Sequence, residues 1–456
     1  MLTVLGTGTG DTAPPAAEAL ATATLVAGAR RHLDAAAGRV PAGAVRLELG
    51  PLSPALETIA AHLAEAGAAP HAARRVVVLA SGDPGFFGIV RALADRFGPE
   101  ALTVAPSAPS VAVAFSRAGL PWDDAAVVSA HGRDRRTAVN VCRAHPKTAV
   151  LTGPGAGPAE LGADLVRAGT ARTLVVAAAL GTPAERLERL TPAQAAQRDW
   201  PEPVSVVLCL DEARALAAGR RAIAGPARPA GGWALPEEEF GHRDSMITKA
   251  EVRALALARL GPGLGDLVWD VGSGCGSVAV ECARLGAAAV AVEQAADAVA
   301  RIRANAAAHG TDVQVEHGTA PAALEGLPEP DAVFVGGGGR SLPAVVAACA
   351  RRARRAVVVT LAALDRVPDV RAALAAEGFA TDGVLLQSSR LAPLPGDVVR
   401  LAATNPVFVL WGTRPSPPPG PGPGEDARGS PGVPPGPVPA PSGPDPVPTS
   451  PKEPLP

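Results

Sequence analysis

The sequence predicts an α/β protein with two ordered regions and a disordered tail. Short runs of β-branched and other apolar residues alternate with Ala-, Leu- and Arg-rich segments of helical length over most of the 456 residues. Strands this apolar are typical of sheets that helices cover on both faces. Hydrophobic residues make up 47% of the chain and charged residues 19%, so it can bury more than one core.

The first region spans residues 1–212 and alternates expected strands with helical segments. The expected strands lie at 2–6, 24–28, 75–80, 102–106, 125–130, 148–153, 173–178 and 203–210. Residues 213–234 are rich in Ala, Gly and Pro, which is typical of a linker between two domains.

The second region, residues 235–413, opens with the helical segment TKAEVRALALARLG. Thr248 is its expected N-cap, and Glu251 stands where a capping box requires it. This order predicts one doubly wound, Rossmann-like sheet that ends in an antiparallel pair. Its expected strands lie at 266–272, 288–293, 313–318, 331–337, 355–362, 383–389 and 405–412.

The last region, residues 414–456, is rich in Pro and Gly and has almost no large apolar side chains. Such a segment does not recover the entropy lost on ordering, so we expect a disordered, locally polyproline II tail. An alternative role for it is to dock a partner with an SH3-like domain.

Composition argues against several classes of partner. The formal net charge of −2 gives no general reason to expect nucleic acid or an anionic membrane. The five cysteines contain no C-x-x-C pair and no His at metal-ligand spacing, so we expect free thiols in a reducing cytosol and no metal. The sequence also contains no signal peptide and no apolar run of about 18 residues, which predicts a cytoplasmic protein.

A Gly-rich turn after the strand at 266–272 predicts a cofactor site in the second region. Gly272, Gly274 and Gly276 form G-x-G-x-G, whereas dinucleotide sites use G-x-G-x-x-G. Glycine permits the turn and removes the Cβ that would obstruct a ligand. Glu293 ends the next strand, where its carboxylate can accept both hydroxyls of a ribose. The alternatives are a simple strand–helix turn and, against the spacing, an NAD site.

The second region resembles a known enzyme family over nearly all of its length. LPEEEFGHRDSMITKAEVRALALARL, VWDVGSGCGSVAVECAR, AVAVEQ, DAVFVGGGG and TNPVFVLWG are similar to the decarboxylating cobalt-precorrin C15 methyltransferases of cobalamin synthesis. These are class I methyltransferases, and G-x-G-x-G is their spacing for S-adenosylmethionine. The resemblance implies cofactor contacts from Thr248, Gly272, Ser273, Gly274, Cys275, Gly276, Glu293 and Ala320. The chain departs from the family pattern at Thr319, Pro395 and Asp397.

The first region resembles the tetrapyrrole (class III) methylases, and the precorrin C5 methylases most of all. VVLASGDPGFFG contains their G-D-P loop, and VLGTGTGD, the stretch at 105–134, VLTGPGAGPAEL and LGTPAERL follow in family order. The resemblance implies a two-lobed α/β domain. Thr9 replaces the usual Pro of the first loop, and GDPG taken alone is an ordinary β-turn. The implied cofactor residues are Gly82, Asp83, Pro84, Gly85 and Thr152.

Together, the two regions resemble fused decarboxylating precorrin methyltransferases. This implies S-adenosylmethionine-dependent methylation of precorrin-6Y or 6B at carbons 5 and 15, with decarboxylation of the ring C acetate, giving precorrin-8. It also implies two cofactor sites, self-association, and no metal or pyridoxal phosphate for decarboxylation. The alternatives are an NAD(P)-linked precorrin reductase and a scaffold that recruits pathway partners through the tail.

The acidic substrate suggests where to look for substrate contacts. Precorrins carry acetate and propionate groups, which arginine binds well. A solvated, Arg-rich surface would look the same in the sequence. His131 in SAHGRD is a candidate for proton handling or substrate contact, with a structural hydrogen-bonding role as the alternative. The candidate cations are Arg133, Arg135, Arg136, Arg243, Arg340, Arg390 and Arg400.

Overall fold

The computed structural model describes residues 1–8, 14–65, 74–200, 205–216, 224–226, 232–243, 247–337 and 339–415. The predicted tail therefore lies outside the described residues, apart from 414 and 415. None of the described helices is both long and apolar enough to cross a membrane.

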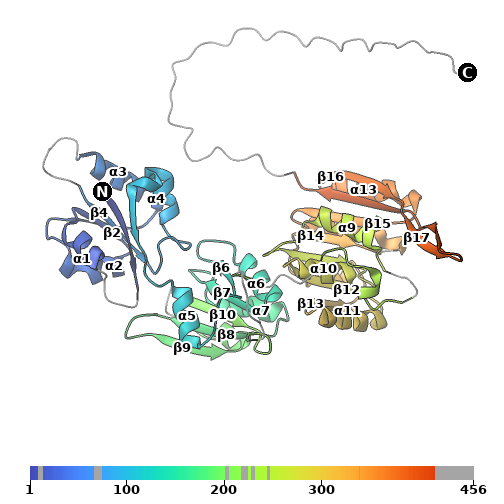
Figure 1. Ribbon diagram of the computed structural model, residues 1–456, viewed down its shortest axis with the longest axis horizontal. Helices are drawn as coiled ribbons and strands as arrows, with labels where there is room; N and C mark the ends of the chain where they lie inside the picture. The colour runs from blue at the N-terminus through green and yellow to red at the C-terminus, as the bar shows by residue number, and fades with distance from the viewer. Residues whose placement is uncertain are drawn as a thin grey trace, which may run out of the picture. The chain divides into compact units, whose positions relative to one another are not determined.

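The first lobe contains a five-stranded, fully parallel sheet in the order β3-β2-β4-β1-β5. Figure 1 shows this lobe at the blue, N-terminal end of the chain. Because all the strands run the same way, the loops that follow them meet at one edge. The strands are β1 (Leu2–Thr7), β2 (Leu25–Gly28), β3 (Val45–Glu48), β4 (Val76–Ser81) and β5 (Leu102–Ala105). The helices are α1 (Pro14–Ala21), α2 (Arg30–Ala36), α3 (Leu52–Ala64) and α4 (Val90–Phe97).

The second lobe has a mixed sheet in the order β6-β7-β10-β8-β9, in which only β6 and β7 pair in parallel. The two lobes confirm the expected two-lobed α/β domain. The strands are β6 (Ala126–Ser129), β7 (Lys147–Leu151), β8 (Thr173–Ala178), β9 (Arg186–Leu190) and β10 (Ser205–Leu210). The helices are α5 (Ser110–Ala118), α6 (Arg135–Ala144), α7 (Pro158–Arg167) and α8 (Pro192–Ala196).

The second domain has a seven-stranded sheet in the order β13-β12-β11-β14-β15-β19-β16. Its strands are β11 (Leu267–Val271), β12 (Ala288–Glu293), β13 (Val313–His317), β14 (Ala332–Val335), β15 (Ala356–Leu361), β16 (Ala380–Leu386) and β19 (Val407–Thr413). Strand β19 runs antiparallel to both β15 and β16, which confirms the predicted antiparallel finish. A separate hairpin pairs β17 (Ser389–Leu394) with β18 (Val398–Ala403).

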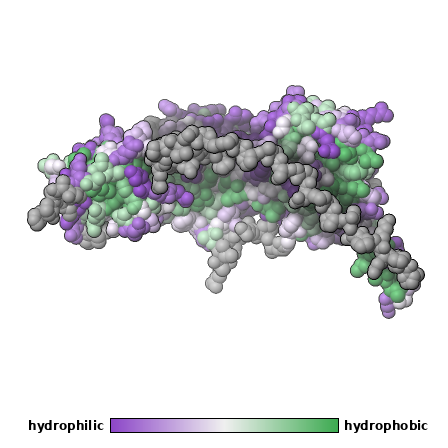
Figure 2. Space-filling view, turned by 90° about the horizontal axis from the view of Figure 1, so that it is seen from above, coloured by the Kyte–Doolittle hydropathy of each residue, from purple (hydrophilic) through white to green (hydrophobic). Residues whose placement is uncertain are grey.

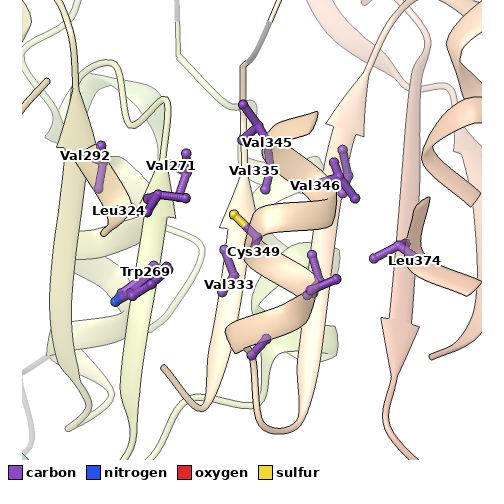
Figure 3. Close-up of a cluster of buried hydrophobic side chains, with 14 of the residues drawn as sticks. Trp269, Val271, Val292, Leu324, Val333, Val335, Val345, Val346, Cys349 and Leu374 are labelled. Atoms are coloured by element: carbon purple, nitrogen blue, oxygen red, sulfur yellow. The ribbon is translucent and has the colours of Figure 1, made fainter. Parts of the chain in front are cut away.

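Helices cover both faces of this sheet. The helices are α9 (Ala250–Leu260), α10 (Ser277–Arg284), α11 (Ala296–Ala308), α12 (Leu342–Arg352) and α13 (Val367–Ala376). Trp269 and Val271 of β11 pack with residues of α12, including Cys349 (Figure 3). Val268, which points the opposite way, packs with α9 and α10. Burial on both faces explains why these strands are continuous hydrophobic runs.

Short 3₁₀ helices lie at Ala37–Arg39, Pro99–Ala101, Glu237–Glu239, Ala322–Leu324, Gly339–Ser341 and Leu364–Arg366.

Four strands of the structure were not predicted. Strands β3 and β9 have the sequences VRLE and RLERL, and each lies at the edge of its sheet. Charged residues are common on edge strands because they discourage pairing with another chain. A search for apolar runs therefore misses them. Strands β17 and β18 form the hairpin, most of whose residues are exposed.

The predicted cap of helix α9 is wrong. The helix begins at Ala250, its N-cap position is Lys249, and no side chain caps it from there. The N–H of Ala250 instead donates to Glu237 Oε1 at 2.8 Å, so a distant carboxylate replaces the local cap. Glu251 is not part of a capping box, because Arg390 holds both of its carboxylate oxygens.

A fully buried ion pair attaches the segment before α9 to the second domain. Arg253 Nε donates to Glu281 Oε1 at 3.0 Å, and neither side chain is exposed. The backbone N–H groups of Ala234 and Leu235 donate to the same carboxylate. The guanidinium also donates to the carbonyl oxygens of Thr248 and Leu235. The charges of Arg253 and Glu281 are thus both paired and hydrogen-bonded, as burial requires.

Replacing Glu281 by Gln should leave the guanidinium of Arg253 buried without a counter-charge. We expect the free energy of unfolding of residues 235–413 to fall by about 3–5 kcal/mol. Urea denaturation followed by hydrogen exchange in β11 and β12 measures this. Asp297→Asn is the control, since it breaks an exposed pair with Arg301 and should change little. Equal effects of the two substitutions would contradict the assigned role.

Candidate functional site

The Gly-rich loop of the second domain leaves open space beside its middle glycine. Gly272, Gly274 and Gly276 have φ angles of +70°, +60° and +83°, which side-chain-bearing residues rarely adopt. A Cβ on Gly272 would lie 3.0 Å from the Gly337 nitrogen, and one on Gly276 would lie 3.0 Å from Ile302. A Cβ on Gly274 would meet nothing within 4 Å. The outer glycines thus allow close packing, while the middle one borders room for a ligand.

Glu293 lies against this loop. The sequence predicted that Glu293 and the Gly-rich loop belong to the same cofactor site. Its Oε2 accepts from the Gly274 N–H and its Oε1 accepts from the Ala295 N–H, both at 2.9 Å. A carboxylate has about four acceptor positions, so two remain for hydroxyl groups of a ligand. Parallel pairing of β11 and β12 brings the two groups together.

Asp270, at the end of β11, fixes the shape of the loop. Its Oδ2 accepts from Ser273 Oγ at 2.7 Å and from the Ala279 N–H at 3.0 Å, while the described residues offer Oδ1 no hydrogen bond. Burial raises the pKa of Asp270 to about 6, although the bond from Ser273 opposes that shift. The charge of Glu293 contributes in the same direction as burial.

Asn305 on α11 is a site residue that the sequence reasoning missed. Its Nδ2 donates to the carbonyl oxygens of Cys275 and Gly241 at 2.7 and 3.0 Å. Its Oδ1 accepts from the Gly241 N–H at 2.8 Å. The only signal in the sequence is a polar residue on the buried side of ADAVARIRANAAA. Asn305 therefore joins the Gly-rich loop to the chain that precedes α9.

Ala320 and Thr248 are predicted cofactor residues of this domain that lie outside the Gly-rich loop. Ala320 is half-buried and follows β13, and the neighbouring Gly318 N–H donates to the carbonyl of Glu293 at 3.0 Å. The loop that contains Ala320 therefore lies beside Glu293. Thr248 is half-buried, and its carbonyl accepts from Arg253 at 2.6 Å. Burial raises the pKa of the Cys275 thiol, so this loop residue contributes as backbone rather than as a nucleophile.

In the first domain, the G-D-P loop follows β4 and lies against the end of β1. The Gly82 N–H donates to the Thr7 carbonyl at 2.7 Å. A Cβ on Gly6 would lie only 2.2 Å from the Gly82 oxygen, so the two segments meet backbone to backbone. Asp83 Oδ1 accepts from the Gly85 N–H at 2.8 Å, which closes a turn. The Phe86 N–H donates to the Asp83 carbonyl at 3.1 Å, so the backbone β-turn spans residues 83–86, one residue later than the GDPG turn considered as an alternative. Thr9 lies outside the described residues.

His131 and Thr152 lie close together at the ends of the parallel strands β6 and β7. A Cβ on Gly153 would lie 2.4 Å from His131 Nδ1, so the ring packs directly on the backbone after Thr152. Thr152 is buried and His131 is exposed. The Arg133 guanidinium stacks over the Phe87 ring, 5.5 Å from its centroid, beside the G-D-P loop. These groups belong to one region of the first domain.

Several candidate arginines are already neutralised by carboxylates. Arg135 pairs with Asp164 at 2.7 Å, and Arg136 makes a bidentate pair with Asp331. Arg390 bridges Glu237 and Glu251 through four hydrogen bonds.

The other candidates differ from one another in their pairing. Arg243 lies 3.7 Å from exposed Asp297. Within the described part of the chain, Arg133, Arg340 and Arg400 form no ion pair with a carboxylate.

The described cysteines are all free and buried. Over the described ranges, no three or more His, Cys, Asp and Glu side chains are grouped so that they could hold a metal ion.

Comparisons with known proteins match both halves of the chain. A family model described as tetrapyrrole (corrin/porphyrin) methylases matches residues 1–196, and a precorrin methyltransferase domain model matches residues 238–408. The precorrin-6Y C(5,15)-methyltransferase (decarboxylating) of Sinorhizobium sp is 36% identical over 357 residues, covering 74% of this chain and 78% of that protein.

Two shorter relatives each match less of the chain but nearly all of their own length. The cobalt-precorrin-7 C(5)-methyltransferase of Salmonella typhimurium is 34% identical, covering 46% of this chain and 100% of that protein. The probable cobalt-precorrin-6B C(15)-methyltransferase (decarboxylating) of Pyrobaculum calidifontis is 33% identical, covering 39% of this chain and 93% of that protein.

Asp270→Asn should stabilise the ligand-free second domain at pH 7.5. An unfolded Asp titrates near 3.9, whereas the pKa of Asp270 in the fold is about 6. The folded state therefore binds this proton more tightly, and the charged form costs stability above about pH 6. The advantage of the Asn variant should shrink as the pH falls toward 4. Urea denaturation at several pH values measures it.

Glu237→Gln is the control of opposite sign, because hydrogen bonds from Arg390 lower the pKa of Glu237 to about 2. This variant should be less stable than the wild type at pH 7.5. An advantage of Asp270→Asn that grew on acidification would refute the assignment.

Proposed function

Because the chain belongs to the precorrin-6Y C(5,15)-methyltransferase (decarboxylating) family, we propose that it holds two molecules of S-adenosylmethionine, one in each domain. The enzyme is a decarboxylating C-methyltransferase that methylates precorrin-6Y at carbons 5 and 15 in cobalamin biosynthesis. The observation that carries the two-site proposal is the presence of two unlike loops, Gly82–Gly85 and Gly272–Gly276. Each follows a parallel strand at the edge where such sheets bind ligands.

We divide the reaction between the domains. Residues 1–212 would carry methylation at carbon 5, and residues 235–413 methylation at carbon 15 with decarboxylation, with 213–234 as the linker. Single-activity proteins with 46% and 39% coverage of this chain support the division, since their names assign them one methylation each. The tetrapyrrole methylase match ends at residue 196 and the precorrin methyltransferase match begins at residue 238, so the proposed linker lies between them.

The residues of the second domain fit an adenosyl cofactor. The space beside Gly274 admits the ligand close to the backbone, and Glu293 has acceptor positions left for the ribose hydroxyls. Ala320 would border the adenine, and Thr248, whose carbonyl Arg253 holds in place, is a further proposed contact. When bound, the cofactor supplies an electrophilic methyl group on a sulfonium.

In the first domain, the loop from Gly82 to Gly85 and the buried Thr152 are the proposed cofactor contacts. Both lie at the ends of parallel strands, one in each lobe. His131 and Arg133, beside these loops, are the proposed contacts to the macrocycle. An exposed imidazole there can accept the proton that carbon 5 loses when its C–H is replaced by C–CH₃.

The second domain must also support loss of carbon dioxide. As the C–C bond to the ring C carboxylate breaks and carbon dioxide leaves, its electron pair passes into the conjugated macrocycle, which acts as the electron sink. The carbon that lost the carboxyl group then takes up a proton, so that the acetate becomes a methyl group. The protein needs to hold the ring and exclude water. Arg243, Arg340 and Arg400 are the proposed contacts to other acid groups of the substrate. Within the described residues, Arg340 and Arg400 form no ion pair with a carboxylate, unlike Arg390.

Gly274→Ala should remove one of two S-adenosylhomocysteine sites per chain in isothermal titration calorimetry. The new Cβ would occupy the open space that the proposed cofactor uses. Gly261→Ala is a matched control, because Gly261 also has a positive φ, of +56°, and also faces open space. Both variants carry the same kind of backbone strain, but only Gly274 borders the site.

The control should therefore keep both sites. A single site in the wild-type chain would overturn the two-cofactor proposal. Equal loss in the two variants would show that backbone strain, rather than a blocked pocket, removes binding.

We also propose that the enzyme self-associates through the β17–β18 hairpin. The face with Arg390 is anchored to Glu237 and Glu251. On the opposite face, Leu391 pairs with Leu401, and these side chains are 73% and 68% exposed. Exposed hydrophobic residues occur elsewhere too, as the green areas of Figure 2 show, but here they lie side by side on one small sheet.

Two-stranded sheets are marginally stable in water on their own, so this hairpin would gain stability by packing against a partner. The same apolar face on every chain provides a matching surface.

Leu391→Asp should shift the protein toward monomer in analytical ultracentrifugation over a range of concentrations. A charge on this face would have to be buried on association, which is costly. Leu364→Asp is the control, since Leu364 is 65% exposed and lies outside the hairpin. A wild-type chain that is monomeric at all concentrations would contradict the proposal.

A further inference from the structure

A polar cluster at the ligand edge of the first lobe has no role in the sites described above. It consists of Thr7 at the end of β1, Arg31 and His32 on α2, and Ser81 at the end of β4. Ser81 directly precedes the G-D-P loop. We propose that Arg31, held in place by His32 and Ser81, binds a carboxylate group at the first active site.

The hydrogen bonds determine which ring nitrogen of His32 carries a proton. Thr7 Oγ1 donates its single hydrogen to the Ala80 carbonyl at 2.9 Å. Its contact of 2.9 Å with His32 Nδ1 must therefore be one in which Nδ1–H donates. Burial and, to a smaller extent, the charge of Arg31 lower the pKa of His32 to about 4, so the ring is neutral near pH 7. A neutral ring with a proton on Nδ1 has an acceptor at Nε2.

Through this acceptor, His32 orients the side chains of Arg31 and Ser81. Arg31 Nε donates to His32 Nε2 at 3.3 Å, and Arg31 Nη2 donates to Ser81 Oγ at 2.8 Å. Ser81 Oγ lies 2.9 Å from Nε2 and donates its single hydrogen there, so Ser81 fixes the guanidinium of Arg31 as an acceptor and is not itself a donor to a ligand. His32 is thus a positioning residue. The chain of contacts begins at a backbone carbonyl and ends at two exposed groups.

The charge of Arg31 is not neutralised within the described residues. Its two hydrogen-bond partners are neutral, and three of its five N–H groups remain for a ligand. The next residue, Arg30, differs, because Glu48 pairs with it at 3.0 Å. A guanidinium that neutral acceptors hold in place and that keeps three N–H groups suits a carboxylate, which takes two parallel hydrogen bonds.

The proposal rests on the proposed function in one respect, the source of the carboxylate. Acetate and propionate groups of the precorrin are one source, and the methionine part of the cofactor is the other. The cluster adjoins Gly82, so either ligand would reach it at this edge of the sheet. The structural alternative is that the cluster only satisfies polar groups at the ends of β1 and β4.

The test uses the full-length chain with Arg31→Ala, Arg31→Lys and the control Arg30→Ala. Three quantities are measured: the affinity for S-adenosylhomocysteine by calorimetry, and kcat and KM for precorrin-6Y in methylation at carbon 5. We expect Arg31→Ala to weaken one of the two ligands about tenfold, the value of one charged hydrogen-bonding contact. Arg31→Lys should lie between it and the wild type, and Arg30→Ala should match the wild type.

A rise in KM with little change in kcat would place the substrate's carboxylate on Arg31. A weaker affinity for S-adenosylhomocysteine would place the methionine carboxylate there. If Arg31→Ala melts like the wild type and keeps both constants within twofold, the carboxylate site does not exist. If the wild type fails to methylate carbon 5, the proposed function fails instead, and the calorimetric comparison still tests the cluster.

Two variants of His32 test its positioning role. His32→Gln keeps an acceptor near the position of Nε2 and should retain most of the affinity. His32→Leu should lose as much as Arg31→Ala. Equal behaviour of the Gln and Leu variants would refute the positioning role.

Discussion

Parallel pairing of neighbouring strands is the constraint on which both proposed sites depend. In a parallel sheet, every strand ends at the same edge, so loops far apart in the sequence meet there. In the second domain, this brings Gly274 to the carboxylate of Glu293. In the first lobe, it brings Gly82 to the end of β1. Both sheets, although their strand orders differ, therefore bring distant loops together at the edge where a ligand site is proposed.

The loops themselves are short and are held by side chains from other elements. Asp270 fixes the turn that contains Ser273, and Asn305 fixes the carbonyl of Cys275. The buried pair of Arg253 and Glu281 holds the backbone of Ala234 and Leu235, in the segment that precedes α9. Each of these polar groups is buried and hydrogen-bonded, so the loops are prepared for a ligand before it arrives.

Local patterns of the sequence predicted the sheets and the two Gly-rich loops because both depend on short stretches of chain. Apolar runs indicate strands buried on two faces, and G-x-G-x-G marks the turn that leaves open space beside Gly274. Contacts between distant residues were not predictable. Arg390 looks like a free cation in the sequence, yet Glu237, 153 residues away, neutralises it. The cap of α9 failed for the same reason, and Asn305 resembles any polar residue on a helix.

The central claim is that this one polypeptide performs both methylations and the decarboxylation. Mass spectrometry of the product formed from precorrin-6Y and S-adenosylmethionine with a labelled methyl group tests it most directly. The account predicts a product that has gained two labelled methyl groups and lost one carbon dioxide in a reaction with the purified chain alone. A product with a single label, or with its carboxyl groups all retained, would contradict it.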